Sequence, residues 1–159
     1  MSPKSFEKRG DLFIEKMRDA GVIDQALFSM MIELKNETSK ITFGGYDLEA
    51  YAYPNETVRF HNITSDSSHW MLNLEKMTLT NTDDPIDDTK YEFGKNKSII
   101  VDSGTSFLLM PKKDRQQFLN FIQMDKNFLC FEGGIAVCYC MGENYLDYFP
   151  DLVFHIDGH

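Results

Sequence analysis

The sequence predicts a mainly β protein with a few short helices. Residues 28–34 and 40–43 are apolar stretches on either side of a polar turn, which is the pattern of a β-hairpin. Residues 70–74 place apolar side chains at every second position, as a half-buried strand does. Residues 99–101 are all β-branched, so they favour a buried strand. With 159 residues the chain is long enough for one domain with a core of its own.

The N-terminal part is expected to hold two short helical segments after a tail. Residues 1–10 are predicted to be a mobile tail or a connector between domains. Asp11 can cap a helix that runs to residue 20, and Gly21 then ends it, as glycine commonly does just beyond a helix. A further helical turn is expected over residues 24–27, before the first strand of the hairpin begins.

The middle of the chain is expected to consist of short extended pieces and turns. Gly44 and Gly45 follow the returning strand and mark a turn or a close approach of the backbone. Residues 51–54 and 58–63 are predicted to be extended. The alternating strand then continues to residue 79, with a break at Lys76.

The second half is expected to contain one helix, one hairpin and a last strand. Residues 80–88 form an acidic loop, which is predicted to be a solvated hairpin tip. Residues 113–123 carry apolar side chains at helical spacing, so a helix is expected there. Residues 127–131 and 135–140 are predicted to pair as a hairpin, and residues 149–156 to form the last apolar strand.

One segment carries residues suited to chemistry. Asp102 directly follows the β-branched strand, and four small residues come after it: Ser103, Gly104, Thr105 and Ser106. Glycine lets the backbone turn sharply, and hydroxyl groups can hold a carboxylate by hydrogen bonds. An ordinary Asp-Ser-Gly turn would contain the same residues. The apolar neighbours 99–101 and 107–111 favour instead a semi-buried aspartate, and such carboxylates tend to be functional.

This segment resembles the second active-site motif of the pepsin-like aspartic endopeptidases, in a cathepsin-D-like form. Four further segments match the same family in the same order, at residues 21–29, 41–47, 70–74 and 149–158. The resemblance implies that residues 11–159 are the C-terminal lobe of such an enzyme, without the family's final strands. It also implies an N-terminal lobe that carries the first aspartate, and peptide substrates cleaved between apolar residues at acid pH.

The resemblance assigns a role to each residue of the motif. Asp102 is the catalytic carboxylate, Ser103 braces the two active-site loops, and Thr105 holds the Asp102 carboxylate. Gly104 supports the active site together with Ser103 and Thr105. Both Gly104 and Ser106 contact the substrate backbone. The sequence contains no second Asp-Ser/Thr-Gly. Catalysis therefore requires the missing N-terminal lobe or a second copy of this chain, and the alternative is a non-catalytic detached lobe that binds peptides or proteins.

The composition excludes several other classes of protein. The net charge of −9 argues against nucleic acid as a partner, since phosphate binding requires a basic face. No run of about twenty apolar residues is present, so no membrane span is expected. No cofactor and no metal are expected, because the acidic loop lacks EF-hand spacing and the cysteines lack a fourth zinc ligand. The histidines are scattered along the sequence, at His61, His69, His155 and His159.

Four Asn-x-Ser/Thr sequons favour a secretory route. They lie at Asn36, Asn55, Asn62 and Asn96, and together they predict a glycoprotein that is lysosomal, vacuolar or secreted. Residues 1–9 are charged and lack the apolar core of a signal peptide. The sequence is therefore expected to be a fragment, a processed form or an incomplete gene product.

Three cysteines leave at least one thiol without an internal partner. Cys138 and Cys140 are too close in sequence to bridge comfortably. Cys130 with either Cys138 or Cys140 would close a small hairpin loop, and the remaining cysteine could pair with one beyond residue 159. Three reduced thiols are the alternative.

Overall fold

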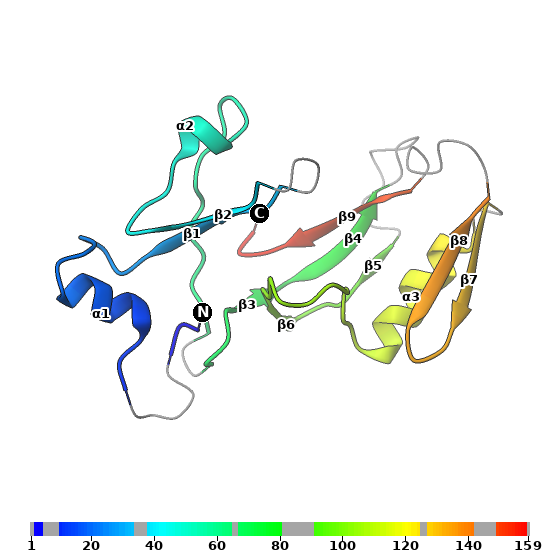
Figure 1. Ribbon diagram of the computed structural model, residues 1–159. Helices are drawn as coiled ribbons and strands as arrows, with labels where there is room; N and C mark the ends of the chain where they lie inside the picture. Colours follow the sequence, from blue (N-terminus) through cyan, green and yellow to red (C-terminus); the bar gives the residue numbers. More distant parts are fainter. Residues whose placement is uncertain are drawn as a thin grey trace. The chain divides into compact units, whose positions relative to one another are not determined.

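The computed structural model describes residues 2–4, 10–33, 38–64, 67–80, 91–124, 127–141 and 149–158. The chain divides into two compact units, Met1–Trp70 and Met71–His159 (Figure 1). The Asn36 sequon, the acidic residues 81–88, His159 and most of the predicted tail lie outside the described residues.

Helix α1 (Phe13–Asp19) opens the first unit. The predicted cap at Asp11 is wrong, because Leu12 occupies the capping position and its backbone N–H donates to Glu15 Oε2 at 3.2 Å. A carboxylate three residues inside a helix can reach back to the first free N–H group, which removes the need for a side-chain cap before the helix.

The end of α1 is as predicted. Gly21 has a φ of +69° just beyond the helix, in the left-handed region that glycine adopts without a steric penalty. Its N–H donates to Arg18 O, and the N–H of Val22 donates to Met17 O, each at 2.9 Å. These two bonds satisfy carbonyl groups that the helix itself leaves free.

Strands β1 (Phe28–Met31) and β2 (Lys40–Phe43) pair antiparallel and confirm the predicted hairpin. Phe28 lies opposite Phe43 and Met31 opposite Lys40. The helical turn predicted at residues 24–27 is wrong. The backbone bends there instead, with Leu27 N–H donating to Gln25 O at 2.8 Å, a contact too short in sequence for a helix.

Gly44 marks both a turn and a close approach, as predicted. It has a φ of +80°, and a Cβ at this position would lie 2.9 Å from Ile23 Cβ. Its N–H donates to Leu27 O at 2.8 Å, so the backbone after β2 is held against the segment before β1.

A short helix that the sequence analysis did not predict follows, α2 (Leu48–Tyr51). Asp47 caps it, since the Asp47 side chain accepts a hydrogen bond from Ala50 N at 3.0 Å. Tyr51 is therefore helical and not extended, and residues 58–63 belong to no strand. An aspartate followed by good helix formers was the overlooked signal.

The second unit holds the remaining elements. They are β3 (Met71–Leu74), β4 (Lys76–Thr80), β5 (Glu92–Phe93), β6 (Lys97–Ile100), α3 (Lys112–Ile122), β7 (Phe128–Glu132), β8 (Ala136–Cys140) and β9 (Asp151–His155). They confirm the predicted helix, hairpin and last strand. They also confirm the alternating strand, although its break falls at Glu75, one residue before its predicted place.

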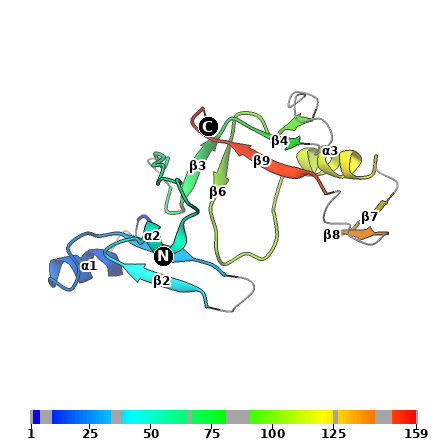
Figure 2. The same cartoon turned by 90° about the horizontal axis from the view of Figure 1, so that it is seen from above.

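The described strands of this unit form three antiparallel sheets (Figures 1 and 2). β3 pairs with β6, the strands β5, β4 and β9 form a sheet in that order, and β7 pairs with β8. None of the described helices is long and apolar enough to span a membrane.

The core of the second unit lies between the β5–β4–β9 sheet and α3. Its buried members are Leu74, Met77, Leu79 and Phe93. Phe118 and Phe121 of α3 pack against them, and the Phe121 ring lies 4.0 Å from that of Tyr91. The helix predicted from apolar spacing therefore covers the sheet through the face that the spacing indicated, with Leu119 and Ile122 also buried.

An ion pair joins β6 to α3. Asp114, in the first turn of α3, is only 3% exposed, and its Oδ2 is paired with the ammonium of Lys97 at the start of β6. The carboxylate also lies where the partial positive charge of the helix N-terminus favours it. Since β6 and α3 flank residues 101–111, this contact fixes both ends of that segment.

A second ionic cluster joins β4 to β5. Glu92 Oε1 lies 2.5 Å from Lys76 Nζ, and Glu92 Oε2 pairs with Lys95. The Glu92 side chain is 16% exposed, so water screens these contacts only partly. The hydrogen bonds to Lys76 and then Lys95 lower the pKa of Glu92 from 4.5 to about 2.

Replacing Asp114 should destabilise the second unit. We expect Asp114→Asn to lower the free energy of unfolding by about 1–3 kcal/mol, less than for a fully buried pair because Lys97 is 37% exposed. Urea denaturation at pH 7 measures this change. The matched control is Glu132→Gln, which neutralises another carboxylate paired with α3 but half-exposed, and should cost at most about 1 kcal/mol. Equal losses in the two variants would contradict the assigned importance of the buried pair.

The Glu92 cluster should make a pH-dependent contribution to stability. The folded-state pKa of Glu92 lies below its ordinary value, so its contribution is complete above about pH 4.5 and is lost as the pH falls towards 2. The difference in unfolding free energy between the wild type and Glu92→Gln should therefore be constant above pH 5 and shrink between pH 4.5 and 2. Urea midpoints at five pH values test this, and a difference that grows on acidification would refute it.

Candidate active site

The segment 101–111 connects β6 to α3 as a long loop (Figure 2). The predicted buried strand 99–101 is wrong in part. Only Ile99 packs against the core, Ile100 is exposed, and Val101 is 58% exposed and lies beyond the strand. β6 pairs antiparallel with β3 in a two-stranded sheet, so successive side chains point to opposite faces and only one face meets the core.

Asp102 is exposed, which corrects the expectation of a semi-buried carboxylate. That expectation rested on the apolar neighbours in the sequence. Phe107, Leu108 and Leu109 are themselves exposed, Leu109 by 77%, and Met110 is the residue of this run that packs against the core. Apolar neighbours therefore do not surround the carboxylate in the structure of this chain.

Both oxygens of the Asp102 carboxylate accept hydrogen bonds from its own loop. Gly104 N–H donates to Oδ1 at 2.9 Å, and the Thr105 hydroxyl donates to Oδ2 at 2.5 Å. A Cβ on residue 104 would lie 3.2 Å from Oδ1, so a larger side chain would crowd the carboxylate. The loop thus fixes the direction of the carboxylate by two short-range contacts.

The structure brings three of the five predicted site residues together: Asp102, Gly104 and Thr105. Ser103 and Ser106 are exposed in the same loop. The roles that the resemblance implies for them, and for Gly104 against a substrate, stay predictions.

A carboxylate of this kind can act as a proton acceptor towards a water molecule or a substrate, because it is accessible and held in one orientation. Hydrolysis by paired carboxylates requires a second acidic group within hydrogen-bond distance. Within the described residues no group of three or more His, Cys, Asp or Glu side chains is arranged to hold a metal ion. His155 instead lies beside Thr78, with Nε2 2.9 Å from Thr78 Oγ1.

The first unit contains an apolar pocket of about 240 Å³ that the sequence analysis did not predict. It is lined mainly by side chains of β1, β2 and α2, among them Met30, Met31, Leu48 and Tyr51, and also by Val58. Lys40 lies at this pocket and donates to the Tyr51 hydroxyl at 3.2 Å. Residues far apart in sequence build the pocket, so no local pattern indicated it.

The described sequon asparagines, Asn55, Asn62 and Asn96, are all exposed. Asn55 and Asn96 lie in turns with φ values of +70° and +51°, which asparagine tolerates better than most residues. Of the cysteines, Cys130 and Cys138 form a disulfide and Cys140 is free, which selects one of the two pairings that the sequence left open.

Comparison with known proteins identifies the family. The family model for eukaryotic aspartyl proteases matches residues 3–159. Aspartic proteinase sxa1 of Schizosaccharomyces pombe is 28% identical over 90% of this chain, and pepsin II-2/3 of Oryctolagus cuniculus is 27% identical over 91%. Plasmepsin VII of Plasmodium berghei is 28% identical over 72% of the chain.

The chain spans only 27%, 33% and 26% of the lengths of these three relatives. No solved structure matches it. The predicted resemblance to pepsin-like enzymes is nevertheless confirmed, because the family model covers nearly the whole chain. The chain belongs to the eukaryotic aspartyl protease family.

Proposed function

We propose that this chain supplies one catalytic aspartate, Asp102, to an aspartic endopeptidase. The observation that carries the proposal is the Asp102 carboxylate, which is exposed and bonded on both oxygens by Gly104 N–H and the Thr105 hydroxyl. An accessible carboxylate that is held in one direction is suited to act on a substrate.

Two carboxylates share one proton in the proposed reaction. Two carboxyl groups this close cannot both ionise. The ionised carboxylate takes a proton from the attacking water, while the protonated carboxyl group polarises the scissile carbonyl. The sequence holds a single Asp-Ser-Gly-Thr, so the second aspartate comes from an N-terminal lobe or from a second copy of this chain. Ser103 then braces the two loops, and Gly104 with Ser106 contacts the substrate backbone.

The proposed substrates are peptides or proteins cleaved between apolar residues. The exposed apolar side chains of Phe107, Leu108 and Leu109 follow the catalytic motif directly and support this preference. The low pKa of Glu92 supports work at acid pH, because the contact between β4 and β5 stays ionic where many carboxylates are protonated. The cathepsin-D-like specificity stays a prediction.

We further propose a lysosomal, vacuolar or secreted location with N-linked glycans. The exposed sequons at Asn55, Asn62 and Asn96 and the Cys130–Cys138 disulfide support it, since disulfides persist in oxidising compartments.

A non-catalytic lobe that binds peptides or proteins is the second candidate function. The single aspartate motif favours it, because one carboxylate cannot form the shared-proton pair.

Replacing Asp102 should abolish acid proteolysis. Hydrolysis of a quenched apolar peptide between pH 3 and 7 measures activity, and we expect Asp102→Asn to lower it by at least about 10²–10⁴-fold. If two copies form the site, the activity of the chain alone should rise with the square of its concentration.

Thr105→Val should lower the activity about 10–100-fold, because the hydrogen bond to the charged Asp102 carboxylate is lost, while Thr105→Ser retains the hydroxyl and should retain the activity.

The matched control is Asp157→Asn, outside the motif at a position whose φ of +51° asparagine adopts readily. Its activity should equal that of the wild type. Unchanged activity in Asp102→Asn would refute the catalytic role. A folded but inactive wild type that still binds a peptide inhibitor with a tetrahedral hydroxyl would favour the binding lobe instead.

The glycan proposal has its own test. Protein secreted from a eukaryotic host should lose mass on treatment with peptide N-glycosidase, and the number of glycans should fall by one in each of Asn55→Gln, Asn62→Gln and Asn96→Gln if the three sites are used. A secreted protein whose mass the enzyme does not change would refute the proposal.

A further inference from the structure

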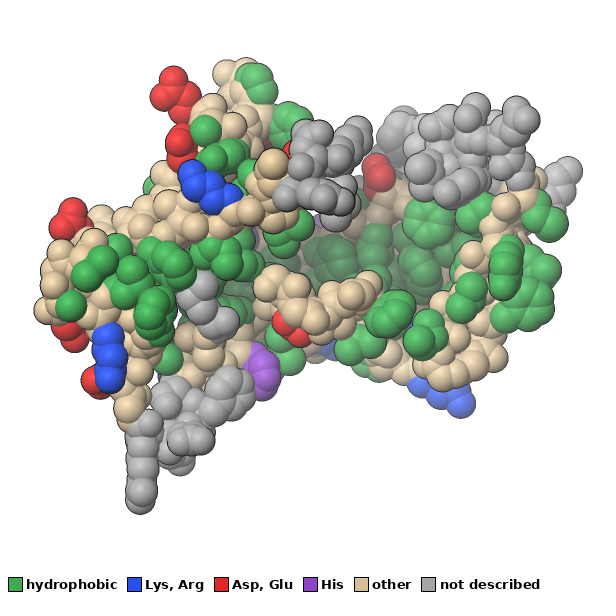
Figure 3. Space-filling view, in the orientation of Figure 1, with side chains coloured by type: hydrophobic (Ala, Val, Ile, Leu, Met, Phe, Trp, Pro, Cys, Tyr) green, Lys and Arg blue, Asp and Glu red, His purple; other side chains and the backbone are tan. Residues whose placement is uncertain are grey.

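The pocket of the first unit combines an apolar lining with two hydrogen-bond donors. The β1–β2 hairpin and α2 supply most of its lining, and Figure 3 shows hydrophobic side chains gathered over these elements, with acidic and basic side chains among them. Lys40 and Tyr51 both line the pocket, and the Lys40 ammonium donates to the Tyr51 hydroxyl at 3.2 Å. The kind of ligand that suits the pocket depends on the protons that these two groups still offer.

Lys40 and Tyr51 present donors, not acceptors, to a ligand. An ammonium group has three N–H donors, and a tyrosine hydroxyl that accepts from Lys40 still has its own O–H to donate. Among the described residues, neither group has a further hydrogen-bond partner. The ammonium lies 5.5 Å from the centroid of the Tyr51 ring, which also holds it in place. Two adjacent donors, one of them charged, favour the two oxygens of a carboxylate.

The acidic residue that lines the pocket, Asp47, is engaged in another contact. Its carboxylate accepts a hydrogen bond from Ala50 N at 3.0 Å and caps α2. Asp47 and Tyr51 stand at opposite ends of this helix, about 6 Å apart along its axis. Within the part of the chain that the structure describes, no carboxylate forms an ion pair with Lys40, so the positive charge is left for a ligand.

The size and the lining of the pocket select one aromatic ring. A dry protein cavity of about 150 Å³ holds benzene, so the 240 Å³ found here holds a ring with a few further atoms. The volume is below the roughly 300 Å³ at which sites for larger ligands begin. Met30 and Met31 line the pocket, and methionine sulfur makes favourable contacts with aromatic rings.

We propose that this pocket binds a small aromatic monocarboxylate, an acid with one ring and a carboxylate on a short chain. The ring packs against Met30, Met31 and Leu48, and the carboxylate accepts hydrogen bonds from Lys40 Nζ and the Tyr51 hydroxyl. The site belongs to the first unit, whereas Asp102 belongs to the second, so the proposal does not rest on the proposed endopeptidase function.

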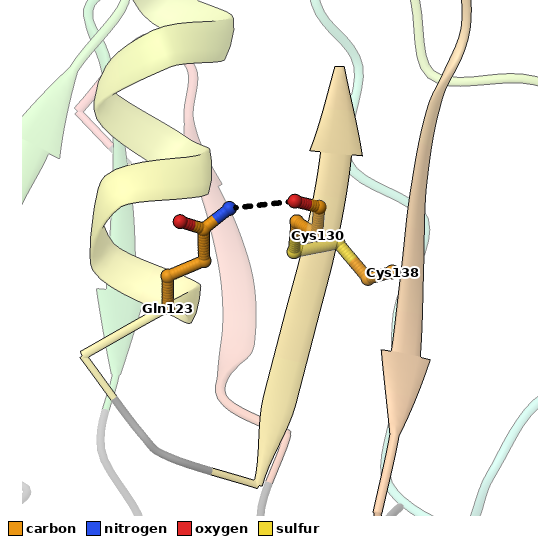
Figure 4. Close-up of a disulfide and its surroundings, with 3 residues drawn as sticks. All are labelled: Gln123, Cys130 and Cys138. Atoms are coloured by element: carbon orange, nitrogen blue, oxygen red, sulfur yellow. Dashed lines mark hydrogen bonds between the residues drawn. A yellow bond between two sulfur atoms is a disulfide. The ribbon is translucent and has the colours of Figure 1, made fainter. Parts of the chain in front are cut away.

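Titration of the full chain with 3-phenylpropionate at pH 7 tests the proposal. The NMR signals of ¹³C-labelled methionine methyl groups report binding, and no reducing agent is added, so that the Cys130–Cys138 disulfide (Figure 4) stays intact. We expect the signals of Met30 and Met31 to shift with a Kd of about 0.1–1 mM, as suits so small a ligand. Met124, which is 70% exposed in the second unit, should not shift. Equal shifts at all three residues, or at Met124 alone, would overturn the proposal.

Three further ligands separate the roles of the ring, the charge and the size. 3-Phenylpropionamide has the same ring without the charge and should bind about tenfold more weakly. Acetate lacks the ring and should cause no shift at the same concentration. The peptide N-acetyl-Gly-Gly-Phe carries the ring and the carboxylate on a longer chain and should bind no more tightly than the free acid. Equal affinity for the acid and the amide would refute recognition of the carboxylate, and tighter binding of the peptide would refute a small acid as the occupant.

Two variants test the donors. Lys40→Met should weaken the binding of 3-phenylpropionate about tenfold and leave the affinity for the amide unchanged, because only the charged contact is lost. Tyr51→Phe keeps the ring and loses the O–H, and should weaken the binding of the acid about 3–10-fold. The matched control is Lys16→Met, an exposed lysine on α1 of the same unit, which should bind as the wild type does.

The variants can also contradict the proposal. If Lys40→Met lowers the affinities for the acid and the amide equally, Lys40 shapes the pocket and does not recognise the charge. If Lys40→Met does not fold, Tyr51→Phe decides, and wild-type affinity for the acid in that variant would overturn the two-donor site.

Discussion

The position of the loop over residues 101–111 depends on the ion pair between Lys97 and Asp114. The loop has eleven residues, is largely exposed and makes few contacts with the core of its own unit. Its ends are nevertheless fixed, because the strand before it and the helix after it are joined by a carboxylate that is 3% exposed. A buried carboxylate requires its partner, so this contact strongly restricts where β6 and α3 lie relative to each other.

Residues within the loop orient the Asp102 carboxylate. Gly104 and Thr105 supply donors to the two oxygens of Asp102 from only two and three residues away. Such local contacts form wherever the sequence Asp-Ser-Gly-Thr can turn, and they need no support from the rest of the fold. A shared-proton pair does not form through local contacts of this kind, because it requires a second carboxylate that must be brought from another segment. The local geometry of the Asp102 carboxylate is therefore complete in this chain, while the proposed reaction requires a second carboxylate.

The second unit also carries exposed apolar residues on the loop over residues 101–111 and on the β7–β8 hairpin. On the loop over residues 101–111, Val101 and Leu109 are exposed, and on the hairpin Phe131 is exposed, although valine, leucine and phenylalanine are usually buried. Surfaces of this kind commonly mark contacts with other protein segments. The ionic contacts of Glu92 and Asp114 join β4 to β5 and β6 to α3 in the same unit, and the low pKa of Glu92 maintains the first of these contacts in acid.

The sequence by itself determined the mainly β class, the two hairpins, the helix that was predicted over residues 113–123 and the hydrogen bond from Thr105 to Asp102. These features follow from side-chain periodicity and from contacts between residues close in sequence, which a pattern can report. Only the tertiary structure decided that Asp102 and Val101 are exposed, that Asp114 is buried against Lys97, and that Cys130 pairs with Cys138. Burial depends on which distant segments pack together, and an apolar neighbour in sequence covers a residue only if the chain folds back over it.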